Sequence, residues 1–126
     1  MTLVLDAGAF LRLERGDRAT WRRLENAFEA GARPLTHGGV VAQVWRGGEG
    51  RQALLARALP MVGVIPLDDQ LGRRAGLLLA RSGTADAVDA AVVAVARPGD
   101  RILTSDPDDI DRLVEASRLD IAVIPV

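Results

Sequence analysis

The sequence predicts an α/β fold: a short, mostly parallel β-sheet of four to five strands, flanked by helices on both faces. Short apolar runs alternate with segments of helical periodicity along the whole chain. Strands that alternate with helices at this spacing are typical of βαβ units, whose sheet is parallel. The 126 residues, 48% of them hydrophobic, suffice for one domain with its own core. No repeat or linker divides the chain, so we expect a single domain over residues 1–126.

Composition excludes several classes of site. The chain has no cysteine, which rules out disulfides and thiolate metal sites. All 16 basic residues are arginine, so neither a lysine-dependent phosphate loop nor Schiff-base chemistry is available. The net charge of -1 and 3% aromatic content give no polybasic or stacking signal for nucleic acid. With no signal-peptide pattern and no apolar run of membrane-spanning length, we expect a cytoplasmic protein without a membrane partner.

The first predicted strand is the apolar run Leu3–Leu5, which ends at Asp6 and turns directly into a helix. Sites in open α/β sheets form at the carboxyl ends of the strands, which favours a functional role for Asp6. The alternative is that Asp6 only caps the helix that follows it.

The middle of the chain is expected to contain four helices and two strands. Asp17 is a typical N-cap and Gly31 a typical stop for the first of these helices. His37, the only histidine, is interpreted as a loop or cap residue, because one histidine cannot form a multi-histidine zinc site. Gln43 lies in an otherwise apolar helix, where a polar side chain requires a partner. The expected ranges are helix 17–30, strand 34–36, helix 37–46, helix 51–59, strand 61–65 and helix 68–81.

The stretch Thr84–Ala96, TADAVDAAVVAVA, predicts a buried helix, because every residue after Asp89 is alanine or valine. Asp86 and Asp89 are three residues apart and therefore lie on one side of its first turn. Ionised carboxylates rarely occupy such a place unless they are paired, hydrogen-bonded or bound to a metal. The alternative is that Asp86 is an N-cap and Asp89 an acid favoured by the helix dipole.

The last part of the chain repeats the pattern of an aspartate after a strand. The strand 101–104 is followed by Asp106, and Pro107 suits the start of the final helix. Residues 121–126 form the closing strand. If the strands before Asp6 and Asp106 are parallel neighbours, these two carboxylates and Asp89 meet at one sheet edge. Oxygen ligands without histidine or cysteine suit Mg²⁺ or Mn²⁺, and such an ion can activate water against a phosphodiester.

Three motifs in this order, VLDAGAF, TADAVDAAVVAVA and ILTSDPDDI, resemble a PIN domain, and more closely the toxin nuclease of a VapBC-type toxin–antitoxin pair. The resemblance covers essentially the whole chain. It implies cleavage of single-stranded RNA with Mg²⁺ or Mn²⁺, a cognate antitoxin as partner, and a homodimer. It assigns metal binding and catalysis to Asp6, Asp89 and Asp106, a further catalytic acid to Asp86, and supporting roles to Gln43, Thr104 and Asp109.

The sequence departs from that family at two positions. Many members carry a glutamate on the middle helix where this chain has Gln43, and a hydroxyl residue where it has Gly8. A neutral amide can coordinate through its oxygen but cannot act as a base. The alternative function is therefore a catalytically weak or inactive PIN scaffold that binds RNA or a protein partner. Four arginines are candidates for phosphate contacts, the alternative being a solvated surface: Arg12, Arg15, Arg46 and Arg51.

Overall fold

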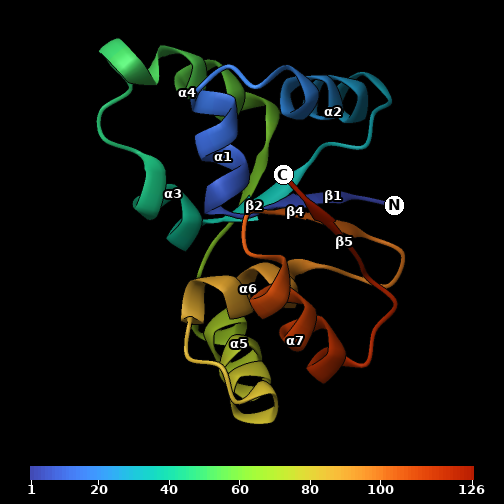
Figure 1. Cartoon of the computed structure of the whole chain (residues 1–126). Helices are drawn as coiled ribbons and strands as arrows, with labels where there is room; N and C mark the ends of the chain where they lie inside the picture. The colour runs from blue at the N-terminus through green and yellow to red at the C-terminus, as the bar shows by residue number, and fades with distance from the viewer.

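The computed structural model describes all 126 residues and contains a five-stranded sheet in which every pair of neighbours is parallel (Figure 1). The strand order is β3-β2-β1-β4-β5. The α/β class, the parallel sheet and the number of strands expected from the sequence are thus confirmed. The strands are β1 (Leu3–Leu5), β2 (Leu35–His37), β3 (Gly63–Ile65), β4 (Arg101–Thr104) and β5 (Ala122–Pro125).

Helices cover both faces of this sheet. In Figure 1 the helices α1, α2 and α4 lie above the sheet, α3 lies to the left of the strands at their height, and α5, α6 and α7 lie below the sheet. Because both faces are covered, the central strand β1 is apolar throughout, and all three of its residues are buried. The helices are α1 (Ala7–Glu14), α2 (Arg18–Glu29), α3 (Gly38–Val44), α4 (Ala53–Ala58), α5 (Asp69–Ser82), α6 (Ala87–Val95) and α7 (Pro107–Ser117).

Helix α6 lies where its composition predicts, between the sheet and the two outer helices α5 and α7. Its buried residues fall on every side of the helix, so an all-apolar sequence is required there. Only its first turn reaches the edge of the core, and that turn carries Asp86 and Asp89.

The region between β2 and β3 differs from the expectation in its boundaries. The predicted helix 51–59 is divided into a 3-10 turn Gly50–Gln52, helix α4 and a second 3-10 turn Leu59–Met61. Helix α4 ends at Ala58, and Pro60 lies near the start of the second 3-10 turn, where its missing N–H costs no hydrogen bond. Strand β2 extends to His37, whose ring then caps α3 by accepting a hydrogen bond from Gly39 N.

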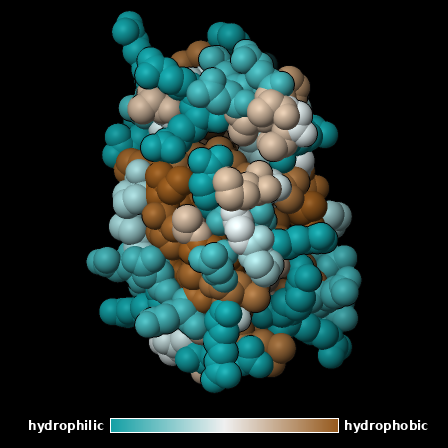
Figure 2. All heavy atoms as spheres, turned by 90° about the vertical axis from the view of Figure 1, so that its right-hand side faces the viewer, coloured by the Kyte–Doolittle hydropathy of each residue, from teal (hydrophilic) through white to brown (hydrophobic).

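The two ends of the strands face different sides of the molecule. Figure 2 shows the side at which the amino ends of the strands emerge, where apolar atoms gather in a band across the middle. Two hollows lie there, one between α5, α6 and α7 and the other beside Met1 and α2. The carboxyl ends, and the aspartates that follow them, lie on the opposite side.

No helix of the chain combines the length and the apolar character that crossing a bilayer requires.

Candidate metal centre

Asp6 joins the central strand β1 to helix α1 and is held by three hydrogen bonds. Its Oδ1 accepts from Ala9 N at 2.8 Å, which is the N-cap bond of α1. Its Oδ2 accepts from Thr104 Oγ1 at 2.5 Å and from Ser105 N at 3.2 Å. The residue is only 3% exposed. Asp6 therefore caps α1 and also lies at the carboxyl edge of the sheet, so the two interpretations of this residue do not exclude each other.

The neighbouring strand β4 brings Asp106 to the same edge. Strands β1 and β4 are parallel neighbours with Leu5 opposite Leu103. This is the arrangement under which the sequence analysis expected Asp6 and Asp106 to meet at one sheet edge. Thr104 Oγ1 donates to Asp6 and accepts from Asp106 N at 2.8 Å, so one hydroxyl links the two aspartates. Asp106 occupies the N-cap position of α7, yet its side chain makes no capping hydrogen bond. Its carboxylate is exposed and free to bind a ligand.

The first turn of α6 contains two aspartates in different situations. Asp86 is the N-cap of the helix, and its Oδ1 accepts from Val88 N at 2.9 Å and from Asp89 N at 3.0 Å. Asp86 is exposed. Asp89 is half-buried, and its carboxylate accepts no hydrogen bond from the chain. Of these two aspartates, only Asp89 has both carboxylate oxygens free of hydrogen bonds, and its carboxylate lies near those of Asp106 and Asp109.

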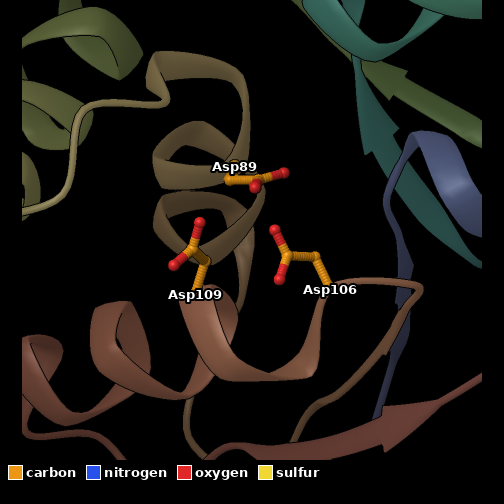
Figure 3. A group of neighbouring side chains, drawn as sticks. All are labelled: Asp89, Asp106 and Asp109. Atoms are coloured by element: carbon orange, nitrogen blue, oxygen red, sulfur yellow. The ribbon is translucent and has the colours of Figure 1, made fainter.

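Three carboxylates converge at this edge: Asp89 from α6 with Asp106 and Asp109 from α7 (Figure 3). One oxygen atom from each lies within 4.8 Å of the others. Asp109 is one helical turn beyond Asp106, so both side chains leave the same face of α7. Asp109 also lies 4.0 Å from the guanidinium of Arg112, a contact too long and exposed to neutralise it.

The electrostatics of the group favour a cation. Burial, followed by the negative charges of Asp86, Asp6, Asp106 and Asp109, raises the pKa of Asp89 to about 7. Burial also raises the pKa of Asp6, although its hydrogen bonds from Thr104, Ala9 and Ser105 oppose that effect. Clustered carboxylates that repel one another in this way are stabilised by a nearby positive charge.

The geometry suits a small divalent ion. Mg²⁺ binds oxygen at about 2.0–2.1 Å in an octahedron, so opposite ligands stand about 4 Å apart. One oxygen from each carboxylate lies within 4.8 Å of the others, and no hydrogen bond restrains the carboxylates of Asp89 and Asp106 from turning toward a shared ion. Three monodentate carboxylates leave the remaining positions to water and substrate, as Mg²⁺ sites require. Asp89, Asp106 and Asp109 would hold the ion.

The expected ligand set differs from the observed group at one position. The resemblance implies Asp6, Asp89 and Asp106 as ligands with Asp109 in support; in the structure Asp109 lies with Asp89 and Asp106 in the tight group, and Asp6 stands outside it. Both oxygens of Asp6 accept hydrogen bonds, and its negative charge still acts on Asp89. The roles of Asp6 as a ligand and of Thr104 as a supporting residue stay predictions.

Gln43 lies outside the acidic group. Gln43 is exposed on α3, and its side chain makes no hydrogen bond within the chain. Its amide can therefore bond to water and does not need the protein partner that the sequence suggested. Glu49 is also exposed, beyond the end of α3. Helix α3 therefore contributes no carboxylate to this edge.

His37 caps α3, as one of the two interpretations from the sequence held, but its link to α6 was not predicted. Its side chain is fully buried, and its Nε2 lies 2.9 Å from Val88 O, in the first turn of α6. Its Nδ1 accepts from Gly39 N at 3.0 Å, which leaves the proton on Nε2 to donate to Val88 O. Burial lowers the pKa of His37, consistent with this neutral form. The imidazole thus holds the turn that carries Asp89. The only feature of the sequence that pointed to this role was the position of His37 directly after the predicted strand 34–36.

Gly8 allows another element to approach α1. A Cβ at this position would stand 1.7 Å from Ser105 Oγ and 2.3 Å from Ser105 Cβ. The absence of a side chain at Gly8 therefore lets the side chain of Ser105 pack directly against the first turn of α1. Where many members of the PIN family carry a hydroxyl residue at the position of Gly8, this chain has the Ser105 hydroxyl beside Gly8, supplied by the loop after β4.

No protein-family model matches the chain, and a search of curated proteins finds no match. The geometry of the acidic group and its surroundings is accordingly what supports a function.

Proposed function

We propose that this protein is a Mg²⁺- or Mn²⁺-dependent endoribonuclease of the PIN-domain type that cleaves single-stranded or loop regions of RNA. The observation that carries the proposal is the convergence of Asp89, Asp106 and Asp109 within 4.8 Å at the carboxyl edge of a parallel sheet. The pKa of about 7 at Asp89, raised first by burial and then by the neighbouring carboxylates, supports it, because a cation in the group would stabilise the charged form that both effects disfavour.

Each acidic residue has a separate task in this proposal. Asp89, Asp106 and Asp109 would hold the cation, which when bound lowers the pKa of water and offsets the charge that develops on a phosphodiester. Asp6 accepts the Thr104 hydroxyl and the Ser105 N–H, and so holds the loop that carries Asp106. Asp86 caps α6 and adds negative charge beside Asp89.

The biological setting follows from the family resemblance. We infer a cytoplasmic toxin of a type II toxin–antitoxin pair, active as a homodimer and inhibited by a cognate antitoxin protein. Expression of the chain should then arrest growth, and co-expression of an antitoxin encoded in a neighbouring reading frame should relieve the arrest. Arrest that persists in the Asp89→Asn variant would contradict a toxic nuclease activity.

The test of the activity is cleavage of a mixed tRNA and ribosomal RNA pool by antitoxin-free protein with Mg²⁺, with Mn²⁺ and with EDTA. We expect discrete cuts with either metal, none with EDTA, and none from Asp89→Asn. Asp111→Asn is the matched control, because Asp111 is exposed on α7 outside the acidic group. Equal cleavage by wild type and Asp89→Asn, or cleavage that survives EDTA, would refute the proposal.

Gln43 favours a second function, that of a catalytically weak scaffold that binds RNA or a protein. Helix α3 presents an exposed amide, not a carboxylate, and adds nothing to the acidic group. Titration calorimetry separates the two functions: Mg²⁺ or Mn²⁺ binding that Asp106→Asn abolishes supports the nuclease. Folded protein that binds neither metal and cuts no RNA supports the scaffold.

A further inference from the structure

A hollow of about 200 Å³ opens beside the acidic edge, on the side of helix α1. Five residues line it: Gly8, Leu11, Arg12, Arg15 and Ser105. Gly8, Leu11 and Arg12 of α1 and its C-cap Arg15 follow the helical spacing i, i+3, i+4, i+7 and lie along one side of that helix. The fifth comes from the loop between β4 and α7 that also holds Asp106.

The lining of this hollow offers hydrogen-bond donors and positive charge and no acid. Arg12 and Arg15 take part in neither of the two ion pairs of the chain. The guanidinium of Arg15 makes no hydrogen bond within the chain, and that of Arg12 makes a single exposed one, to Val126 O at 3.3 Å. The Ser105 hydroxyl likewise has no hydrogen-bond partner. These donors are free to bind an anion, and guanidinium groups suit phosphate oxygens.

The hollow lies next to the proposed metal centre, because its lining residue Ser105 directly precedes Asp106 in the chain. Ser105 N donates to Asp6 at 3.2 Å, and Ser105 is adjacent in sequence to both Thr104 and Asp106. Gly8 has no side chain at the point where Ser105 packs, and this keeps the two sites side by side. A positive hollow next to an acidic group that needs a cation matches a polyanion, whose successive phosphates can occupy the two sites.

We propose that this hollow, the Arg12–Arg15 subsite, binds a backbone phosphate of the single-stranded RNA next to the phosphate that is cleaved. The inference rests on the proposed function and names how its substrate is held. Because phosphate contacts carry no sequence information, the subsite positions the strand without selecting bases. Arg12 and Arg15 are then binding residues, and the acids remain responsible for cleavage.

The test measures binding and cleavage separately. Binding of a labelled 12-nucleotide RNA of mixed sequence is followed by fluorescence anisotropy at several salt concentrations, on the Asp89→Asn chain so that the probe stays intact. Arg12→Gln/Arg15→Gln is compared with Arg18→Gln/Arg22→Gln, which removes the same charge from the exposed surface of α2. Cleavage is measured on chains that keep Asp89.

We expect Arg12→Gln/Arg15→Gln to weaken RNA binding on the order of tenfold at low salt, and to reduce the salt slope of log K by about 0.7, the value for one phosphate contact on a single strand. Cleavage should show a raised KM with an unchanged kcat, as expected when uniform binding is lost. The control pair should keep the wild-type slope and KM.

Two results would overturn the subsite. One is binding and KM equal to wild type in Arg12→Gln/Arg15→Gln; the other is an equal loss in the control pair, which would indicate a general charge effect. In either case metal-dependent cleavage by wild type would leave the proposed function standing. If the wild-type chain neither binds nor cleaves RNA under any metal, the proposed function fails and the subsite fails with it.

Discussion

Replacement of Asp89 by asparagine should stabilise the protein in EDTA at neutral and alkaline pH. The pKa of Asp89 is about 7 in the fold, against an ordinary value of 3.8. The folded state therefore binds this proton more tightly than the unfolded chain, and stability is lost as pH rises from about 4 through 7. Asparagine has no charge to bury, so the variant escapes this loss.

The magnitude follows from the size of the shift. At about 1.4 kcal/mol per pKa unit, a change from 3.8 to about 7 corresponds to about 4 kcal/mol if fully expressed. Asp89 is only half-buried, and solvent screens part of the repulsion from the exposed Asp86 and Asp106, so we expect about 2 kcal/mol. The variant should come closest to wild type near pH 4, where Asp89 is protonated in the folded state and still partly protonated in the unfolded chain, and should exceed wild type by this amount at pH 8.

Urea denaturation at pH 4, 6 and 8 in EDTA measures this difference. Asp111→Asn, on the exposed surface of α7, should show no such pH-dependent gain. Adding Mg²⁺ should raise the stability of wild type, by about 2.7 kcal/mol at a hundredfold excess over Kd, and leave Asp89→Asn unchanged. If the variant gains no stability over wild type between pH 4 and pH 8, burial and the neighbouring carboxylates do not disfavour the charged form of Asp89, and the reasoning is refuted.

Three further predictions concern the surroundings of the acids. Thr104→Val should lower the free energy of unfolding by about 1–3 kcal/mol in urea denaturation at pH 7, because Asp6 and Asp106 N lose their shared hydroxyl; an unchanged stability would contradict this role. His37→Leu should cost about 2 kcal/mol near pH 7.5 and less near pH 5, because the lowered pKa of the neutral imidazole makes its contribution fall as pH drops below 6.5; a pH-independent loss would argue against the neutral form. Gly8→Ala should destabilise by about 1–3 kcal/mol through collision with Ser105, and Ser105→Gly in the same chain should recover most of that loss; additive effects in this double-mutant cycle would exclude the contact.

Much of the fold is encoded in local patterns that can be read without the structure. The alanine and valine run after Asp89 predicts a buried helix because no other environment accepts a helix that is apolar on all sides. The short runs before Asp6 and Asp106 predict buried parallel strands for the same reason, and β1 and β4 are found as expected. The caps Asp17, Asp68 and Asp86 depend only on the next three residues, so the starts of α2, α5 and α6 were predictable.

Composition and local pattern alone thus determined the α/β class, the buried α6 and the placement of aspartates at strand ends. Tertiary structure decided which of these acids meet. The pairing of β1 with β4 sets the Thr104–Asp6 hydrogen bond across 98 residues of sequence, and that bond engages Asp6 while Asp109 joins Asp89 and Asp106. The link from His37 to Val88 likewise depends on how α6 packs on β2. Helical and strand periods specify which face of an element is buried, but the partner of a polar atom depends on strand order and packing, which are set by contacts between residues far apart in the chain.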